Sequence, residues 1–348
     1  MMIVTMRPGA SVAEIGAVLR TCQDVGLRAV PNHGEQGAII GVVTADRSTD
    51  LSSVAALPGV AQVAPVSASF KLVGREFRAE PTVVEAAGVP IGGPEFVVMA
   101  GPCSVEDEEQ IEVCAGAVAR AGGRILRGGA YKPRTSPYSF QGLGEAGLML
   151  LAAAGRRHGL PTITEVMHPH LVGTVAAHAD ILQIGARNVQ NYALLEAVGK
   201  ARKPVLLKRG LMTTVEELLL AAEYILAGGN RQVILCERGI RTFETSTRNT
   251  LDVTAVPVIK SKSHLPVILD PSHAAGLREF VPALARAAMA VGADGIMVEM
   301  HPEPEKAMSD GRQSLHLDTF AAMMDELRRL GEALGRPLAS PQPPGVRA

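Results

Sequence analysis

The sequence predicts a closed (β/α)8 barrel of the TIM type, preceded by a small ferredoxin-like α+β domain. Eight short apolar runs alternate with helical patterns, which favours a parallel sheet built from βαβ units. Almost every run ends in Cys, Arg, Lys, Glu or His, and the carboxyl ends of barrel strands share one mouth, so this pattern indicates catalysis. The runs are Phe96–Ala100, Arg124–Leu126, Thr162–Glu165, Ile181–Ile184, Pro204–Leu207, Val233–Cys236, Val267–Leu269 and Gly295–Val298.

The residues before the barrel follow a different pattern. Ser11 and Glu14 are spaced as a capping box, which starts a helix that ends at Gly26. The remaining elements are strands at Ile3–Met6, Leu27–Val30, Ala38–Val43 and Val60–Val66, with a short helical stretch near Leu51–Leu57. The order βαββαβ is typical of a ferredoxin-like module. Its surface shows no catalytic cluster.

We expect four segments along the chain. A ferredoxin-like regulatory domain spans 1–69, a linker and a hairpin at the barrel bottom span 70–94, the catalytic barrel spans 95–336, and a flexible tail spans 337–348. Ser104 is the expected cap of the helix through Asp107–Ala121, Thr213 with Glu216 forms an expected capping box, and Leu317–Leu330 forms the last helix. A doubly wound sheet is the competing fold, but no Gly-rich dinucleotide fingerprint follows the first barrel strand.

Composition excludes several classes of function. The chain has 348 residues, 47% hydrophobic content and a formal net charge of −1, so no long-range field favours nucleic acid or an anionic membrane. The four cysteines are scattered, no secretory signal opens the sequence, and no apolar run could span a bilayer. We therefore expect a soluble protein in the reducing cytoplasm.

Four possible metal ligands fall at or after neighbouring strand ends. Cys103 follows the first strand, His273 follows the seventh, and Glu299 and Asp310 follow the eighth. A thiolate, an imidazole and two carboxylates suit Mn, Fe, Co or Zn better than calcium or magnesium. Each of these residues alone is more simply a buried or surface side chain, but their joint position predicts a site for one divalent metal ion.

A second group of residues is cationic and follows the ends of strands two, four, five and six. Converging Arg and Lys side chains need anions, and guanidinium groups match phosphate and carboxylate in two-point contacts. The substrate should therefore carry several negative charges. The group consists of Arg127, Lys132, Arg134, Arg187, Lys208 and Arg238.

Short motifs surround the ends of the predicted barrel strands. They are Gly101-Pro102-Cys103-Ser104-Val105-Glu106, Arg127-Gly128-Gly129-Ala130-Tyr131-Lys132-Pro133-Arg134-Thr135-Ser136-Pro137, Gln183-Ile184-Gly185-Ala186-Arg187-Asn188, Lys208-Arg209-Gly210, Cys236-Glu237-Arg238-Gly239, Leu269-Asp270-Pro271-Ser272-His273-Ala274 and Val298-Glu299-Met300-His301-Pro302-Glu303-Pro304. These motifs resemble those of the 3-deoxy-D-arabino-heptulosonate 7-phosphate (DAHP) synthases, the entry enzymes of the shikimate pathway. The N-terminal module is similar to that of their type I beta branch, where it serves as an allosteric sensor.

The resemblance implies condensation of phosphoenolpyruvate with erythrose 4-phosphate and release of phosphate. By position, Cys103, His273, Glu299 and Asp310 match the metal ligands. Arg127, Lys132, Arg187, Lys208 and Arg238 match the phosphoenolpyruvate site, and Arg134 with Thr135 the erythrose 4-phosphate site. Lys132 is the candidate general acid, with a metal-bound water as the alternative. Glu237 is expected to orient the water of the site.

Two other functions stay open on the sequence. The 3-deoxy-octulosonate 8-phosphate synthases share the barrel and the metal ligands, but usually carry Ala-Asn-Arg-Ser where this chain has Pro133-Arg134-Thr135-Ser136. A non-catalytic sensor of phosphorylated metabolites leaves the four metal-ligand residues unexplained. The resemblance further suggests tyrosine or phenylalanine as effector and a homotetramer, and no chorismate mutase module is visible.

Overall fold

The computed structural model describes residues 2–34, 37–43, 49–65, 69–133 and 136–339. The chain divides into two compact units, each with its own apolar core. Unit 1 comprises Met1–Pro81 with Ser261–His264, and unit 2 comprises Thr82–Lys260 with Leu265–Ala348.

Unit 1 contains the predicted ferredoxin-like fold. Its elements are β1 (Met2–Met6), α1 (Val12–Asp24), β2 (Arg28–Gly34), β3 (Gly37–Val43), α2 (Ser52–Ala55) and β4 (Val60–Pro65). The sheet has the order β2-β3-β1-β4 and its strands are antiparallel. Val4 and Ile40 of the sheet pack with Ile15 and Val18 of α1 in one core. The predicted capping box is confirmed, since Ser11 and Glu14 bond each other's backbone at the start of α1.

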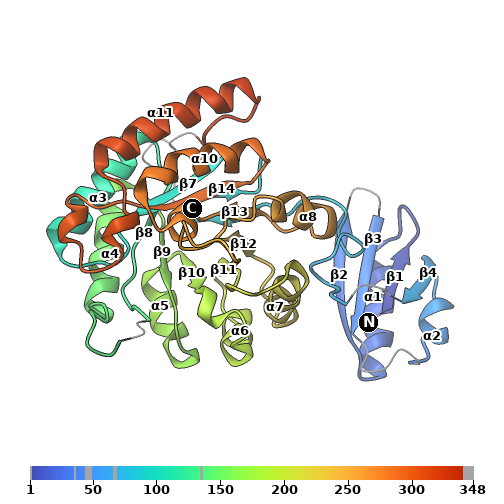
Figure 1. Cartoon of the computed structure of the whole chain (residues 1–348). Helices are drawn as coiled ribbons and strands as arrows, with labels where there is room; N and C mark the ends of the chain where they lie inside the picture. Colours follow the sequence, from blue (N-terminus) through green and yellow to red (C-terminus); the bar gives the residue numbers. More distant parts are fainter. Residues whose placement is uncertain (1, 35–36, 44–48, 66–68, 134–135, 340–348) are drawn as a thin grey trace. The chain divides into compact units, whose positions relative to one another are not determined.

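Unit 2 contains the predicted closed barrel of eight parallel strands (Figure 1). Neighbouring strands pair in chain order, and the last strand, β14, pairs with the first, β7, so that no edge is left open. The strands are β7 (Val97–Gly101), β8 (Ile125–Arg127), β9 (Thr162–Glu165), β10 (Ile181–Ile184), β11 (Val205–Lys208), β12 (Val233–Glu237), β13 (Val267–Leu269) and β14 (Gly295–Glu299).

Helices cover the outside of the barrel, as Figure 1 shows. They are α3 (Glu108–Ala121), α4 (Glu145–His158), α5 (Val172–His178), α6 (Tyr192–Gly199), α7 (Val215–Ala227), α8 (Ala255–Lys262), α10 (Val281–Ala290) and α11 (Leu317–Ala333). Short helical turns on the connections are η1 (Pro169–Leu171), η2 (Ala186–Asn188), α9 (Pro271–Ala275), η3 (Arg278–Phe280), η4 (Pro304–Lys306) and η5 (Gly311–Gln313). The predicted last helix exists and runs three residues further than expected, to Ala333.

Two helix starts differ from the sequence prediction. The cap of α3 is Asp107, whose side chain accepts from the Gln110 backbone, so the expectation of Ser104 is wrong. The capping box of α7 consists of Thr214 and Glu217, one residue beyond the predicted pair. The adjacent Thr213 and Thr214 offer equivalent hydroxyls before α7, whereas α3 begins at Glu108, so its cap position falls on Asp107, three residues after Ser104.

Four strands extend one residue past their apolar run, into the first polar residue. These residues are Arg127, Lys208, Glu237 and Glu299, and each keeps a partner in the ladder of the neighbouring strand. Strand pairing uses only backbone groups, so a charged side chain does not end it. The rigid barrel therefore fixes the backbone of these residues directly.

A β-hairpin of β5 (Val84–Ala86) and β6 (Val89–Ile91) precedes the barrel. Its apolar side chains belong to the same buried core as Met99 and Ile125 of the barrel strands. Gly92, directly after the hairpin, lies against Pro266 at the start of β13. The hairpin thus covers the amino-terminal end of the strands, opposite the mouth.

The ends of the predicted segments make specific contacts. Phe70, Leu72 and Val73 of unit 1 are buried, and Ser263 of the same unit donates a hydrogen bond to the Val73 carbonyl at 2.7 Å. Residues 337–339, which the sequence assigned to a flexible tail, pair with the Phe96 backbone ahead of β7. Residues 340–348 lie outside the described chain, and the segment boundaries remain predictions.

Candidate active site

A polar cavity of about 460 Å³ opens at the carboxyl ends of the barrel strands. Among the described residues, seven cations, one histidine and two carboxylates line it. The cations are Arg127, Lys132, Arg187, Lys208, Arg238, Arg241 and Arg248, and the other groups are His273, Glu165 and Asp310. The excess of positive charge favours a ligand with several negative charges.

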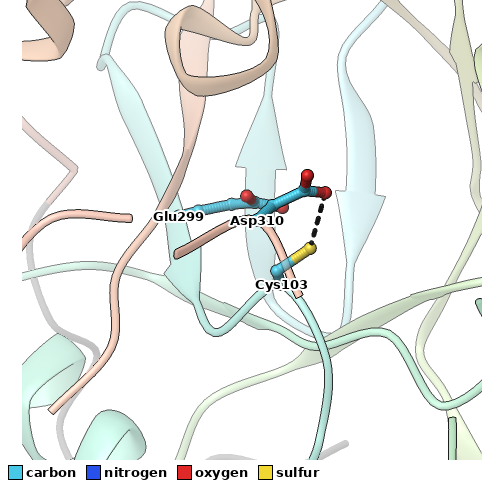
Figure 2. A group of neighbouring side chains, drawn as sticks. All are labelled: Cys103, Glu299 and Asp310. Carbon is cyan, nitrogen blue, oxygen red and sulfur yellow. Dashed lines mark hydrogen bonds between the residues drawn. The ribbon is translucent and has the colours of Figure 1, made fainter. Parts of the chain in front are cut away.

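Three of the four predicted metal ligands form one cluster. The ligand atoms of Cys103, Glu299 and Asp310 lie within 4.8 Å of one another, and Figure 2 shows the three side chains directed toward one another. The Cys103 thiol donates to Oδ2 of Asp310 at 3.2 Å. Gly101, two residues before Cys103, lets the backbone of Arg127 pass close by, because a Cβ at position 101 would lie 2.0 Å from the carbonyl oxygen of Arg127.

The fourth predicted ligand, His273, lies beside this cluster. Its Nε2 is 3.4 Å from Oε1 of Glu299, while its Nδ1 bonds Oδ2 of Asp270 at 2.8 Å. Lys208 donates to the same Asp270 oxygen at 2.5 Å. A carboxylate behind the imidazole is the usual support of a metal-binding histidine, and it leaves Nε2 directed at the cluster.

Sulfur, imidazole nitrogen and carboxylate oxygen together form a donor set that fits a transition-metal ion. All four side chains are on strand ends or loops of the same rim, and only Asp310 and His273 are partly exposed. A bound cation would also offset the negative charges of Glu299 and Asp310, which lie close together. The residues present therefore fit one divalent metal ion.

Lys132 lies against the cluster on the cationic side. Its Nζ donates to Sγ of Cys103 at 2.9 Å and to the Cys103 carbonyl at 3.3 Å. Burial raises the pKa of the Cys103 thiol to about 12, with Glu299 adding to the rise and Lys132 opposing it. Burial lowers the pKa of Lys132, but Cys103 and Glu299 raise it by more, so the side chain is an ammonium at neutral pH.

Glu299 is held on both carboxylate oxygens. Arg127 donates to Oε1 at 2.7 Å and Gln313 donates to Oε2 at 2.7 Å. Burial alone would raise the pKa of Glu299. The nearby charges of His273, Arg127 and Lys132 outweigh this effect and lower the pKa to about 2. The side chain is therefore an anion at neutral pH, as a ligand of a cation must be.

The other cations differ in how far they are already paired. Arg238 is buried, its NH1 has no hydrogen-bond partner among the described residues, and burial lowers its pKa. Arg187 donates to the Pro133 carbonyl at 3.3 Å. Burying a guanidinium group with an unused hydrogen-bond donor costs free energy. The unpaired NH1 of Arg238 therefore indicates that a bound anion completes this side of the cavity.

Three predicted residues are not among those that line the cavity, and two fall outside the described chain. Cys103 and Glu299 contact Asp310 and His273 of the lining. Glu237 is not among the lining residues; its oxygens accept from Arg209 at 2.9 Å and from the Gly239 backbone at 2.6 Å. It thus shapes the loop that carries Arg238 instead of facing the cavity. Arg134 and Thr135 lie outside the described residues.

Sequence reasoning missed several residues of the site. Glu165 and Gln183 line the cavity from β9 and β10 and bond each other at 3.3 Å. Arg241 and Arg248 come from the loop after β12. Glu165 is the last residue of its predicted strand, so the rule that polar residues at strand ends face the barrel mouth could have identified it. Arg241 and Arg248 lie too far from a strand end for this rule to identify them.

No helix in the described part of the chain combines the length and the hydropathy needed to cross a membrane.

A family model described as the DAHP synthetase I family matches residues 79–333, the greater part of the chain. The chain belongs to the DAHP synthetase I family. A second model, the DAHP synthase ferredoxin-like domain, matches residues 2–68 and therefore unit 1. The two models account for both folded parts of this family member.

Curated relatives agree with the family. A phospho-2-dehydro-3-deoxyheptonate aldolase of Thermotoga maritima is 50% identical over 334 residues, covering 96% of this chain and 99% of the relative. A 2-dehydro-3-deoxyphosphooctonate aldolase of Methylococcus capsulatus is 34% identical and covers 71% of this chain. The match to the Thermotoga maritima relative spans nearly the whole chain, including the N-terminal unit. The match to the Methylococcus capsulatus relative is shorter and has a lower identity.

Solved structures show the same relationship. The crystal structure of the Thermotoga maritima DAHP synthase matches with a TM-score of 0.78 and 49% identity, covering 97% of this chain and 99% of that one. A truncated form of the same enzyme matches with a TM-score of 0.73 and 51% identity, covering 78% of this chain and all of that one.

Proposed function

We propose that this family member is a DAHP synthase, a transferase that condenses phosphoenolpyruvate with erythrose 4-phosphate to DAHP and inorganic phosphate. This is the first step of the shikimate pathway to aromatic amino acids. The observation that carries the proposal is 50% identity to the Thermotoga maritima relative over nearly the full length of both chains. The cationic cavity supports it, because both substrates are phosphorylated.

The proposed binding of phosphoenolpyruvate uses the buried cations. Arg127, Lys132, Arg187, Lys208 and Arg238 would hold its carboxylate and phosphate, with fork-shaped guanidinium contacts where geometry allows. Arg134 and Thr135 would bind the phosphate of erythrose 4-phosphate. Holding both reactants in one cavity makes the condensation nearly unimolecular, which is a large part of the expected rate enhancement.

The proposed chemistry forms one carbon–carbon bond. C3 of phosphoenolpyruvate attacks the aldehyde carbon, water adds at C2, and phosphate leaves. Lys132 would donate the proton to the oxygen of the former aldehyde, since it is a buried ammonium beside the cluster. Glu237 would act indirectly, by holding the loop of Arg238 through Arg209 and Gly239.

The proposed cofactor is one divalent metal ion held by Cys103, His273, Glu299 and Asp310. Bound there, it would supply Lewis acidity to the aldehyde oxygen. A thiolate with imidazole and carboxylates favours Mn, Fe, Co or Zn over calcium and magnesium.

Regulation, assembly and location are the remaining proposals. The ferredoxin-like domain would bind an aromatic amino acid, tyrosine or phenylalanine, and change activity by favouring one conformation of the enzyme. We further propose a homotetramer in the cytoplasm.

A phosphate-release assay tests the function. Purified protein with Mn²⁺ and phosphoenolpyruvate is supplied in parallel with erythrose 4-phosphate or arabinose 5-phosphate. We expect turnover with erythrose 4-phosphate and little with arabinose 5-phosphate. The reverse preference would assign the eight-carbon synthase activity of the more distant relatives, and no turnover with either aldose would favour the sensor.

A further inference from the structure

Gln313 is a buried amide, 2% exposed, that connects the two carboxylates of the candidate metal site. Its Nε2 donates to Oε2 of Glu299 at 2.7 Å, and its Oε1 accepts from NH1 of Arg248 at 2.9 Å. The same Arg248 nitrogen lies 3.3 Å from Oδ1 of Asp310. One chain of hydrogen bonds therefore runs from Glu299 through Gln313 and Arg248 to Asp310.

The local backbone explains why residue 313 reaches Glu299. Asp310 has a left-handed conformation with φ of 47°, and the short turn η5 follows it. Within this turn the Gln313 backbone donates to the Asp310 carbonyl at 3.2 Å. The turn also needs Gly311, because a Cβ there would lie 2.1 Å from the Pro304 carbonyl. The turn η5 thus places the side chain of Gln313 against Glu299, at the end of β14.

The chemistry of this position selects an amide. An ionised Glu299 only accepts hydrogen bonds and Arg248 only donates them, so the residue between them must offer one donor and one acceptor. Glutamine does so without adding charge. Methionine has a similar length but removes one hydrogen bond from each neighbour, and it leaves Oε2 of the buried Glu299 without the Gln313 donor.

We propose that Gln313 is a positioning residue of the metal centre, which orients Glu299 directly and Asp310 through Arg248. This inference rests on the proposed function, in which these acids bind the metal. Arg127 and Gln313 hold opposite oxygens of Glu299, which fixes the plane of its carboxylate. Loss of such outer partners typically weakens metal binding by about 10–100-fold.

The test is a Co²⁺ titration of full-length, metal-free protein, followed by the near-ultraviolet absorption that a thiolate gives on binding cobalt. For Gln313→Met we expect the Kd for Co²⁺ to rise by about 10–100-fold. Gln23→Met, on the exposed surface of α1, is the matched control and should keep the wild-type Kd. Circular dichroism and thermal melting of the metal-free proteins check that each variant is folded.

A second variant covers the case in which Gln313→Met does not fold. The Arg248 side chain is 42% exposed, so Arg248→Met removes the other end of the hydrogen-bond chain at a site that tolerates substitution. We expect its Kd for Co²⁺ to rise by about 10-fold, within the range for outer partners. The Kd of the double variant for Co²⁺ should be little higher than that of the weaker-binding single variant, because both substitutions interrupt the same series of hydrogen bonds.

The outcomes separate this inference from the proposed function. If wild-type protein shows no thiolate–cobalt absorption, the metal site itself is refuted and the positioning role with it. If wild-type protein binds Co²⁺ and folded variants at positions 313 and 248 bind it equally well, the metal site stands and the positioning role of Gln313 is overturned.

Discussion

Lys132 donates a hydrogen bond from Nζ to Sγ of Cys103 at 2.9 Å, at the mouth of the barrel. The proposed general acid thus contacts a proposed metal ligand directly. Replacing either residue therefore disturbs the other, and experiments on this pair need one measurement of metal binding and a separate measurement of turnover.

We expect activity to require a divalent metal and Cys103 to bind it. Chelation should abolish phosphate release, and added Mn²⁺ should restore it. Cys103→Ser should lose most of its affinity for Co²⁺, because a hydroxyl is a poor replacement for a thiolate at a transition metal. Cys22→Ser, at another buried cysteine, serves as control. Full turnover in rigorously metal-free protein would contradict this prediction.

Lys132→Met should lower kcat by about 100-fold or more, the usual range for loss of a general acid. The reason is that no proton donor would remain at the position of Nζ. Steady-state rates of phosphate release give kcat, and Co²⁺ titration shows whether the metal site survives. A variant that keeps wild-type kcat would leave Lys132 without a catalytic role.

Arg134→Ala should raise KM for erythrose 4-phosphate far more than KM for phosphoenolpyruvate, because the guanidinium would bind the aldose phosphate in a two-point contact. Arg187→Ala is the matched variant and should show the opposite preference. Initial rates with one substrate varied at a time give both constants. Equal changes of the two constants in Arg134→Ala would show that this arginine does not distinguish the substrates.

Deletion of residues 1–69 should leave an active barrel that tyrosine and phenylalanine no longer inhibit. All proposed ligands and anion-binding residues follow position 100, and a truncated form of the Thermotoga maritima relative has a solved structure. Initial rates against added amino acid are compared for full-length and truncated protein. The same inhibition curve for both would place the effector site on the barrel.

Asp270→Asn should destabilise the protein by about 3–5 kcal/mol, because it leaves Lys208 buried without its anion. Asp325→Asn is the matched control: Asp325 pairs with Arg328 on the surface, so its loss should cost less than about 1 kcal/mol. Denaturant unfolding of metal-free protein measures both. Equal stability of the two variants would mean that the buried pair contributes no more than the surface pair.

Much of the fold follows from local pattern. Strand runs, helix periodicity and the capping box of Ser11 and Glu14 depend on neighbours in sequence, and these predictions were confirmed. The errors were also local: Thr214 caps α7 where Thr213 was expected, since either hydroxyl satisfies the same rule. Sequence pattern identifies a helix start more reliably than the residue that caps it.

The sequence by itself determined which residue types reach the barrel mouth, because a parallel barrel directs every strand end to one rim. It therefore predicted that Arg127 and Glu299 would share a site, although 172 residues separate them. Only the tertiary structure decided which side chains touch. The paths of two loops brought Gln313 and Arg248 together, and Glu237 at the end of β12 bonds Arg209 instead of lining the cavity. Such contacts depend on distances in space, which no spacing along the chain records.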